Sequence, residues 1–339
     1  MRGGTIRERL HISPEVADAL SSGRPVVVLE STLISHGLPY PQNVEVATRS
    51  EAAVRGAGAV PATVAIRDGR ILVGLEPDLL LELATALNVR KASRPSLAGA
   101  LADGGWAATT VSATMIAAHT AGIDVFATGG IGGVHRGALG GLTGGGYRAL
   151  YEGADIGSGG MAGFGLQAPT FDISSDLDEL ARTPLAVVCA GPKAILDVPA
   201  TIEYLETHGV PVVAVGVPDV PGFYARSSGV RAPHSVPDVT AAAGLVATHL
   251  GLALGSSVLV CVPVPEPDAL PTDEARAAVD RAIEDAAAAR VAGAELTPWL
   301  LARIAELTGG ASVVANTALI VNNARVAGEL AARLRAGAS

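Results

Sequence analysis

Residues 25–30 read PVVVLE, and this short stretch decides the fold class. Its apolar residues form an unbroken run, whereas a strand with one face in water alternates apolar and polar residues. Such a run is typical of a strand that is buried on both faces within a parallel sheet. The run ends in a carboxylate, Glu30.

Similar runs recur along the chain, and segments with helical periodicity separate them. They read ATTVS, VFATGG, AVVCAG, VPVVAVG and SVLVCVPV, and they begin at residues 108, 125, 186, 210 and 257. Ser13-Pro14 predicts a helix start, residues 42–55 predict a second helix, and two more helices are predicted to close the chain. Strands that alternate with helices predict an α/β protein with a mostly parallel sheet covered on both faces.

Ligands of such sheets bind beyond the carboxyl ends of the strands. Glu30, Gly129-Gly130 and Lys193 each follow a predicted strand, so we expect them to lie close together. One antiparallel hairpin is also predicted, because the turn signal Arg67-Asp68-Gly69-Arg70 separates two apolar segments.

The composition limits the possible partners and compartments. The 339 residues carry a net charge of −9 and no recurring basic stretch, which argues against nucleic acid as a partner. No run of eighteen apolar residues predicts a membrane span, and the first residues lack the apolar core of a secretory signal. Cys189 and Cys261 lie in apolar runs and are expected to be buried thiols, so we expect a cytoplasmic protein.

Lys91 and Lys193 are the only two lysines, beside twenty-two arginines. An amine can lose its proton and act as a nucleophile or form a Schiff base, whereas a guanidinium stays charged. Lys193 follows a predicted strand and precedes residues 194–197, which we expect to begin a helix; a helix N-terminus repels a cation and so disfavours an idle lysine there. The alternative is that the two lysines have no special role and simply remain in a chain whose composition favours arginine.

Other polar segments allow both structural and chemical interpretations. Glu30 could cap a turn or serve as a general acid or base. The glycine loop that begins at Thr128-Gly129-Gly130 and continues to His135 suits a phosphate, although a plain tight turn is the alternative. Asp172, Ser174, Ser175 and Asp176 suit Mg²⁺ or Mn²⁺, but equally a helix cap. Asn316 could face a polar group from the last helix or be exposed.

Residues 140–165 contain eleven glycines in twenty-six positions. Such a segment offers little apolar surface to bury, so we expect a mobile insertion, at about residues 139–169, within one domain that spans residues 1–339.

Nine stretches, in order from about residue 12 to 330, resemble the pseudouridine-5′-phosphate glycosidase family, also called the indigoidine synthase A-like family. They read LESTLISHGLPYPQN, GAVPATVAI, TTVSATM, VFATGGIGGVHRGA, TFDISSDLDEL, VVCAGPKAILD, TIEYLETHGVPVV, TPWLLARIAELTGG and NNARVA. The resemblance implies a three-layer α/β/α fold, a homotrimer and a divalent metal, typically Mn²⁺. It also implies reversible cleavage of pseudouridine 5′-phosphate to uracil and ribose 5-phosphate.

The resemblance assigns roles to particular residues. It implies that Lys193 is the nucleophile, Glu30 the proton donor and Asn316 an active-site residue. Asp172 would bind the metal, and five residues would contact the substrate: Lys91, Val111, Ser174, Ser175 and Asp176. The chain departs from the family once, because residues 139–169 separate two motifs that are almost adjacent in the family. The relative placement of His135 and Asp172 therefore needs a structure.

The bond in this substrate joins two carbons, so a glycosidase that protonates an oxygen leaving group is inadequate. We hypothesise that Lys193 adds to the opened sugar and forms an iminium, which arginine cannot do. Two alternatives stay open: a Schiff-base aldolase or lyase that acts on another sugar phosphate, and a non-catalytic sugar-phosphate sensor or assembly subunit.

Overall fold

The computed structural model describes residues 4–142, 166–167, 169–291 and 296–337. An eleven-stranded sheet forms its centre, with the main path β1-β4-β3-β2-β7-β11-β15-β13-β14, while β6 pairs with β3 and β5 pairs with β6. Within this sheet β3 runs antiparallel to β4 and β6, and the other pairs are parallel.

The strands of this sheet are β1 (Leu10–Ile12), β2 (Val26–Leu29), β3 (Val60–Arg67), β4 (Arg70–Val73), β5 (Arg90–Ala92), β6 (Trp106–Thr109), β7 (Val125–Ala127), β11 (Ala186–Cys189), β13 (Val212–Val215), β14 (His234–Val236) and β15 (Val258–Cys261). Two small antiparallel pairs lie outside it: β8 (Val134–His135) with β12 (Leu196–Asp197), and β9 (Gly141–Leu142) with β10 (Leu166–Gln167).

The α-helices are α1 (Pro14–Ser21), α2 (Gln42–Gly56), α3 (Pro77–Thr85), α4 (Leu97–Asp103), α5 (Val111–Ala121), α7 (Ser175–Leu180), α8 (Val198–Thr207), α9 (Val239–Gly251), α10 (Thr272–Ala288), α11 (Leu296–Leu307) and α12 (Ala311–Gly337). Shorter helical turns are η1 (Ile6–Arg9), η2 (Leu33–Gly37), η3 (Arg94–Ser96) and η5 (Glu266–Asp268).

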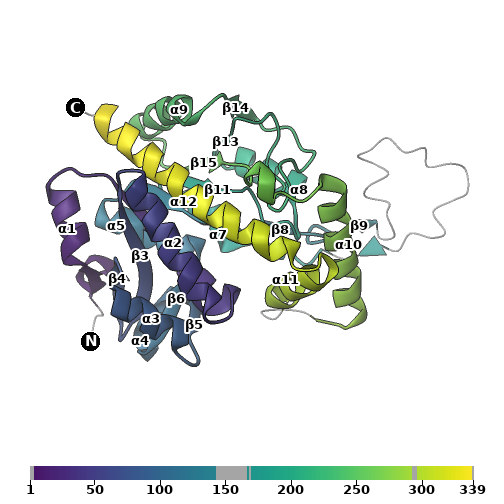
Figure 1. Cartoon of the computed structure of the whole chain (residues 1–339), viewed down its shortest axis with the longest axis horizontal. Coiled ribbons are helices and arrows are strands. Elements are labelled where there is room, and N and C mark those ends of the chain that lie inside the picture. Colours follow the sequence, from purple (N-terminus) through teal and green to yellow (C-terminus); the bar gives the residue numbers. More distant parts are fainter. Residues whose placement is uncertain (1–3, 143–165, 168, 292–295, 338–339) are drawn as a thin grey trace, which may run out of the picture.

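Strand β2 shows why the sheet carries helices on both faces. Val26 and Val28 pack into one apolar cluster with residues of α1, α5, α7 and α8. Val27 and Leu29 point the other way, into a cluster with residues of α2, α9 and α12. Figure 1 shows α12, in yellow, running across the sheet beside α2. The expected three-layer α/β/α arrangement is therefore confirmed.

Several local predictions are confirmed. The Ser13 side chain caps α1 and accepts a hydrogen bond from Val16 N at 3.4 Å. Asp68 and Gly69 turn the β3–β4 hairpin with positive φ values of 49° and 75°. The two cysteines are buried and lie opposite each other on β11 and β15, where a hydrogen bond with Cys189 and burial raise the pKa of the Cys261 thiol.

One local prediction is wrong. Residues 194–197 do not begin a helix, because Leu196 and Asp197 form β12 and pair with β8. Helix α8 begins only at Val198, and its cap is the Asp197 side chain. Lys193 therefore does not lie at a helix N-terminus, and no helix dipole repels its charge there. Its role has to be judged from the groups around it.

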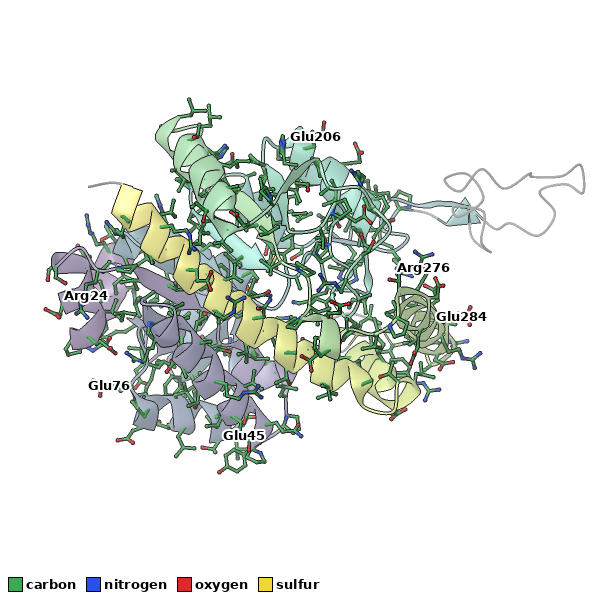
Figure 2. All side chains as sticks on the ribbon, turned by 45° about the horizontal axis from the view of Figure 1, so that its top comes forward. Arg24, Glu45, Glu76, Glu206, Arg276 and Glu284 are labelled. Atoms are coloured by element: carbon green, nitrogen blue, oxygen red, sulfur yellow. The ribbon has the colours of Figure 1, made fainter. Side chains whose placement is uncertain are left out.

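Many charged side chains lie on the outside of the molecule, and Figure 2 labels six of them: Arg24, Glu45, Glu76, Glu206, Arg276 and Glu284. No single helix in the described ranges is long and apolar enough to cross a membrane. Helices α11 and α12, which meet at 118°, pass that test only as a bent pair, by length and composition.

Gly328 allows α12 to lie close to α2. A Cβ atom at this position would be 2.7 Å from the Ala57 Cβ and 3.1 Å from the Val54 carbonyl oxygen. We expect Gly328→Leu to lower the free energy of unfolding by about 1–3 kcal/mol, because a side chain here must push the helices apart. Urea unfolding measures the change.

Gly244→Leu is the matched control, since Gly244 lies in α9 with open space at its Cβ position. That variant should be neutral or gain up to about 1 kcal/mol from helix propensity. Equal losses in the two variants would contradict the close approach at Gly328.

Candidate active site

A cavity of about 290 Å³ opens at the carboxyl ends of three neighbouring strands. Glu30 follows β2, Thr128 and its two glycines follow β7, and Lys193 follows β11. All of them line the cavity, together with Lys91 from β5 and Asn316 from α12. The expectation that polar residues from separate strand ends meet at one place is confirmed.

The Glu30 carboxylate is held by two hydroxyl groups. Thr128 donates a hydrogen bond to one carboxylate oxygen, and Thr32 donates to the other. Glu30 is half-buried at the wall of the cavity. This arrangement fixes the direction of the carboxyl group and links the end of β2 to the end of β7.

Lys193 is attached to the glycine loop through its backbone. Its N–H donates to the Ile131 carbonyl at 3.1 Å, and the Ile131 N–H donates to the Gly191 carbonyl at 3.2 Å. Gly191 has a φ of 85°, a conformation that favours glycine. The lysine therefore lies on a short, fixed connection and not on a helix.

Lys91 shares the cavity with Lys193, and its pKa is lowered. Burial is the largest cause, because it disfavours the charged ammonium group, and the positive charge of Lys193 acts in the same direction. The negative charges of Glu30 and Asp176 oppose the shift. Lys193, Glu30 and Asp176 therefore all lie within electrostatic reach of the Lys91 amine.

The glycine loop serves close packing more than we expected. A Cβ atom on Gly130 would lie 2.6 Å from the Phe223 ring, and one on Gly133 would lie 2.5 Å from the Thr201 hydroxyl. Backbone N–H groups of the loop were expected to face an anion. Four of them instead donate within the protein, from Ile131, Gly132, Val134 and His135.

The predicted substrate contacts that do not line the cavity gather at two helix N-termini. Val111 begins α5, and Ser174 caps α7. Asp176 connects them, because its carboxylate accepts from Ser112 N and Gly132 N, each at 3.0 Å. The Ser175 hydroxyl lies 3.4 Å from that of Ser112. Two helix N-termini side by side favour an anion.

His135 and Asp172 lie next to each other despite the residues between them. The His135 N–H donates to the Asp172 carbonyl at 3.0 Å, and the His135 Nδ1 lies 3.8 Å from the Asp172 carboxylate. Strands β9 and β10 pair at the base of the expected insertion and bring its two ends together. The central part of that insertion lies outside the described residues.

The surroundings of Asp172 decide which kind of metal ion would fit. The carboxylate is 60% exposed, and a single imidazole accompanies it. Among residues with a described placement, no three His, Cys, Asp or Glu side chains form a metal-binding group. One carboxylate suits an ion that takes oxygen ligands and keeps water, such as Mg²⁺ or Mn²⁺, and does not suit a closed zinc site.

Sequence reasoning missed several residues of the site. Asn323 is fully buried on α12, and its amide donates to the Thr128 and Gly129 carbonyls at 2.9 and 3.2 Å. It therefore fixes the loop that holds Glu30. An asparagine in the middle of a helix is a weak signal of such a role. Thr32 and Phe223 gave no signal.

A family model described as indigoidine synthase A like protein matches residues 15–141 and 153–333. The chain belongs to this family. The unmatched residues 142–152 fall within the expected insertion.

Relatives and solved structures extend the match over nearly the whole chain. A protein of Methylobacterium nodulans named pseudouridine-5′-phosphate glycosidase is 49% identical over 330 residues, which cover 97% of this chain and 89% of that protein. A protein of Solibacter usitatus with the same name is 48% identical over 326 residues, which cover 96% and 99%.

Two solved structures are similar to this chain over nearly its whole length. The prealnumycin C-glycosynthase AlnA, solved in complex with ribulose 5-phosphate, has a TM-score of 0.81 and 37% identity, covering 97% of this chain and 98% of that one. An indigoidine synthase A-like protein of Thermotoga maritima has a TM-score of 0.79 and 29% identity, covering 99% of both chains.

The coupling between the two lysines can be measured directly. Because the chain has only two lysines, ¹³Cε-lysine NMR gives one signal for each, and Lys193→Met leaves Lys91 alone. We expect the pKa of Lys91 to lie below its ordinary value and to rise in Lys193→Met, because a neighbouring positive charge disfavours protonation.

Glu30→Gln provides a control of opposite sign. Removal of this negative charge should lower the pKa of Lys91 further. A Lys91 titration that is the same in both variants would show that the groups are too far apart to interact.

Proposed function

We propose that this chain is a pseudouridine-5′-phosphate glycosidase, which reversibly cleaves pseudouridine 5′-phosphate to uracil and ribose 5-phosphate. The observation that carries the proposal is the convergence of Glu30, Lys91, Lys193 and Asn316 on one cavity. The names of the relatives support the choice of substrate.

The reaction begins with opening of the ribose ring. Glu30 gives a proton to the ring oxygen as the C1′–O4′ bond breaks, and the amine of Lys193 bonds to C1′ and passes one of its protons back to Glu30. The two threonine hydroxyls hold the carboxyl group in position for this transfer. General acid catalysis of this kind contributes about 10²–10⁴-fold to a rate.

Cleavage of the carbon–carbon bond follows from the adduct. Glu30 gives the proton that it took from the amine to uracil C5, the C1′–C5 bond breaks, and its electron pair stays with uracil. The nitrogen lone pair of Lys193 forms an iminium with C1′. Water then adds to the iminium and releases ribose 5-phosphate and the free amine, so that water is consumed and the enzyme is regenerated.

The phosphate is expected to lie between Lys91 and the N-termini of α5 and α7. Lys91 lines the cavity, and the Asp176 carboxylate lies at the N-termini of α5 and α7. Thr128, Gly129 and Gly130 would border the sugar. Binding energy from the phosphate can then orient C1′ against Lys193.

We propose that a divalent ion, Mn²⁺, would be held by Asp172, with His135 beside it. Such an ion would supply positive charge to the site. The homotrimer implied by the family resemblance and the cytoplasmic location expected from the buried thiols stay predictions.

Reduction with borohydride tests the role of Lys193. Incubation with ribose 5-phosphate, reduction and peptide mapping should place the label on Lys193, because the proposed adduct is an iminium between this amine and C1′, which borohydride reduces to a stable amine. Lys193→Arg should lose about 10³-fold or more in uracil release while its circular dichroism spectrum is unchanged.

Lys91→Met is the matched control. It should still be labelled at Lys193 but show a KM for pseudouridine 5′-phosphate raised about tenfold, because it loses a charged contact to the phosphate. A label on Lys91, or on neither lysine of the wild-type protein, would reject the mechanism.

Metal dependence gives a separate test. Chelation with EDTA should reduce uracil release, and Mn²⁺ should restore it. Asp172→Asn should weaken Mn²⁺ binding about tenfold in titration calorimetry, because a neutral amide is a poorer ligand than a carboxylate. Asp78→Asn, an exposed residue of α3, should bind Mn²⁺ as the wild-type protein does. Equal affinities in all three proteins would exclude Asp172 as the ligand.

Other activities are tested with a panel of pseudouridine 5′-phosphate, ribose 5-phosphate and ribulose 5-phosphate, the last because a solved neighbour, a C-glycosynthase, is in complex with it. The glycosidase releases uracil from the first compound. The aldolase or lyase alternative predicts turnover of the simple sugar phosphates, and the sensor alternative predicts binding without turnover.

A further inference from the structure

An aromatic ring forms one wall of the cavity, close to the proposed nucleophile. Phe223 lines the cavity and is 4% exposed. The whole chain has only eleven phenylalanine, tyrosine and tryptophan residues, and in the described part only Phe223 among them lines this cavity. The mechanism above gives this ring no role.

The backbone of Phe223 is held in an unusual conformation. Its φ is +65°, a region that residues with bulky side chains rarely adopt. Such a conformation persists where the surrounding structure enforces it, and it occurs often at ligand sites. The neighbouring turn is tight, since Gly222 N donates to the Ala225 carbonyl at 3.0 Å and a Cβ on Gly222 would lie 2.6 Å from the Ser227 carbonyl.

The segment around Phe223 packs against two loops of the cavity, the glycine loop and the loop that carries Lys193. The ring covers Gly130, where an added Cβ would be 2.6 Å from a ring carbon. Pro221 covers Gly191, two residues before Lys193, where an added Cβ would be 2.9 Å from the Pro221 carbonyl. Tyr224 packs edge-to-face against the ring, with centroids 4.9 Å apart at 81°. The ring is therefore fixed between the glycine loop and the lysine loop.

Charged and apolar side chains both line the cavity. Glu30, Lys91 and Lys193 supply the charges, whereas Phe223, Leu301 and Ile320 are apolar. A sugar phosphate needs the charged groups. The group that leaves from C1′ is a flat, uncharged ring, which gains most from an aromatic surface.

We propose that Phe223 is the platform on which the nucleobase stacks, and that it selects flat ring systems as leaving groups. This inference rests on the proposed function and adds a specificity-determining residue to it. The fixed backbone pre-organises the ring, so that base binding costs little ordering of the protein.

The test uses the reaction in the direction of synthesis, in which uracil and ribose 5-phosphate are separate substrates. Phe223→Leu should raise the KM for uracil about tenfold, since it removes the stacking surface. Its KM for ribose 5-phosphate should stay within about twofold of the wild-type value, and borohydride trapping of ribose 5-phosphate should be unchanged, because neither involves the base.

Two further variants separate stacking from simple packing. Phe223→Tyr keeps an aromatic face and should keep the KM for uracil within about twofold, and it also serves if Phe223→Leu fails to fold. Phe126→Leu removes a fully buried ring of β7 that does not line the cavity. It should lower stability and leave both KM values unchanged.

An unchanged KM for uracil in Phe223→Leu, or an equal rise for both substrates, would overturn the platform. So would a tenfold rise in Phe223→Tyr. A wild-type protein that traps no adduct with ribose 5-phosphate would instead overturn the proposed function, so the two failures are distinguishable.

Discussion

The parallel pairing of β2, β7 and β11 is the constraint on which the site depends. Because neighbouring parallel strands end at the same edge of a sheet, the residues that follow them are brought together without any long-range search. Glu30, Thr128 and Lys193 occupy these three strand ends. The hydrogen bonds from Thr128 to Glu30 and from Lys193 to the glycine loop then connect each strand end to the next.

The sequence was sufficient for the layers of the fold and for the strand ends of the site. Unbroken apolar runs such as PVVVLE report burial on two faces, and the structure has those residues alternating between two helical layers. The segment after Lys193 was predicted wrongly because a short antiparallel pair outside the central sheet, with Leu196 opposite His135, overrides a weak local helical pattern.

The residues that sequence reasoning missed act across the fold. Asn323 contacts carbonyl groups nearly two hundred positions away, and Phe223 reaches Gly130 from a different loop. Neither contact can be predicted from the spacing of residues along the sequence. Both depend on how α12 and the loop that carries Phe223 pack on the sheet. The glycines of the loop were read as space for a phosphate, whereas Phe223 and Thr201 occupy much of that space.

The pairing of β9 with β10 has a consequence for the length of this chain. The insertion begins at β9 and ends at β10, and these two strands pair with each other. The two ends of the insertion are therefore held together whatever the number of residues between them. Doubling a closed loop costs only about 0.6 kcal/mol in chain entropy. Lineages can therefore lengthen or shorten this connection with little effect on the neighbouring histidine and aspartate, which makes it a permissive place for grafting foreign sequence.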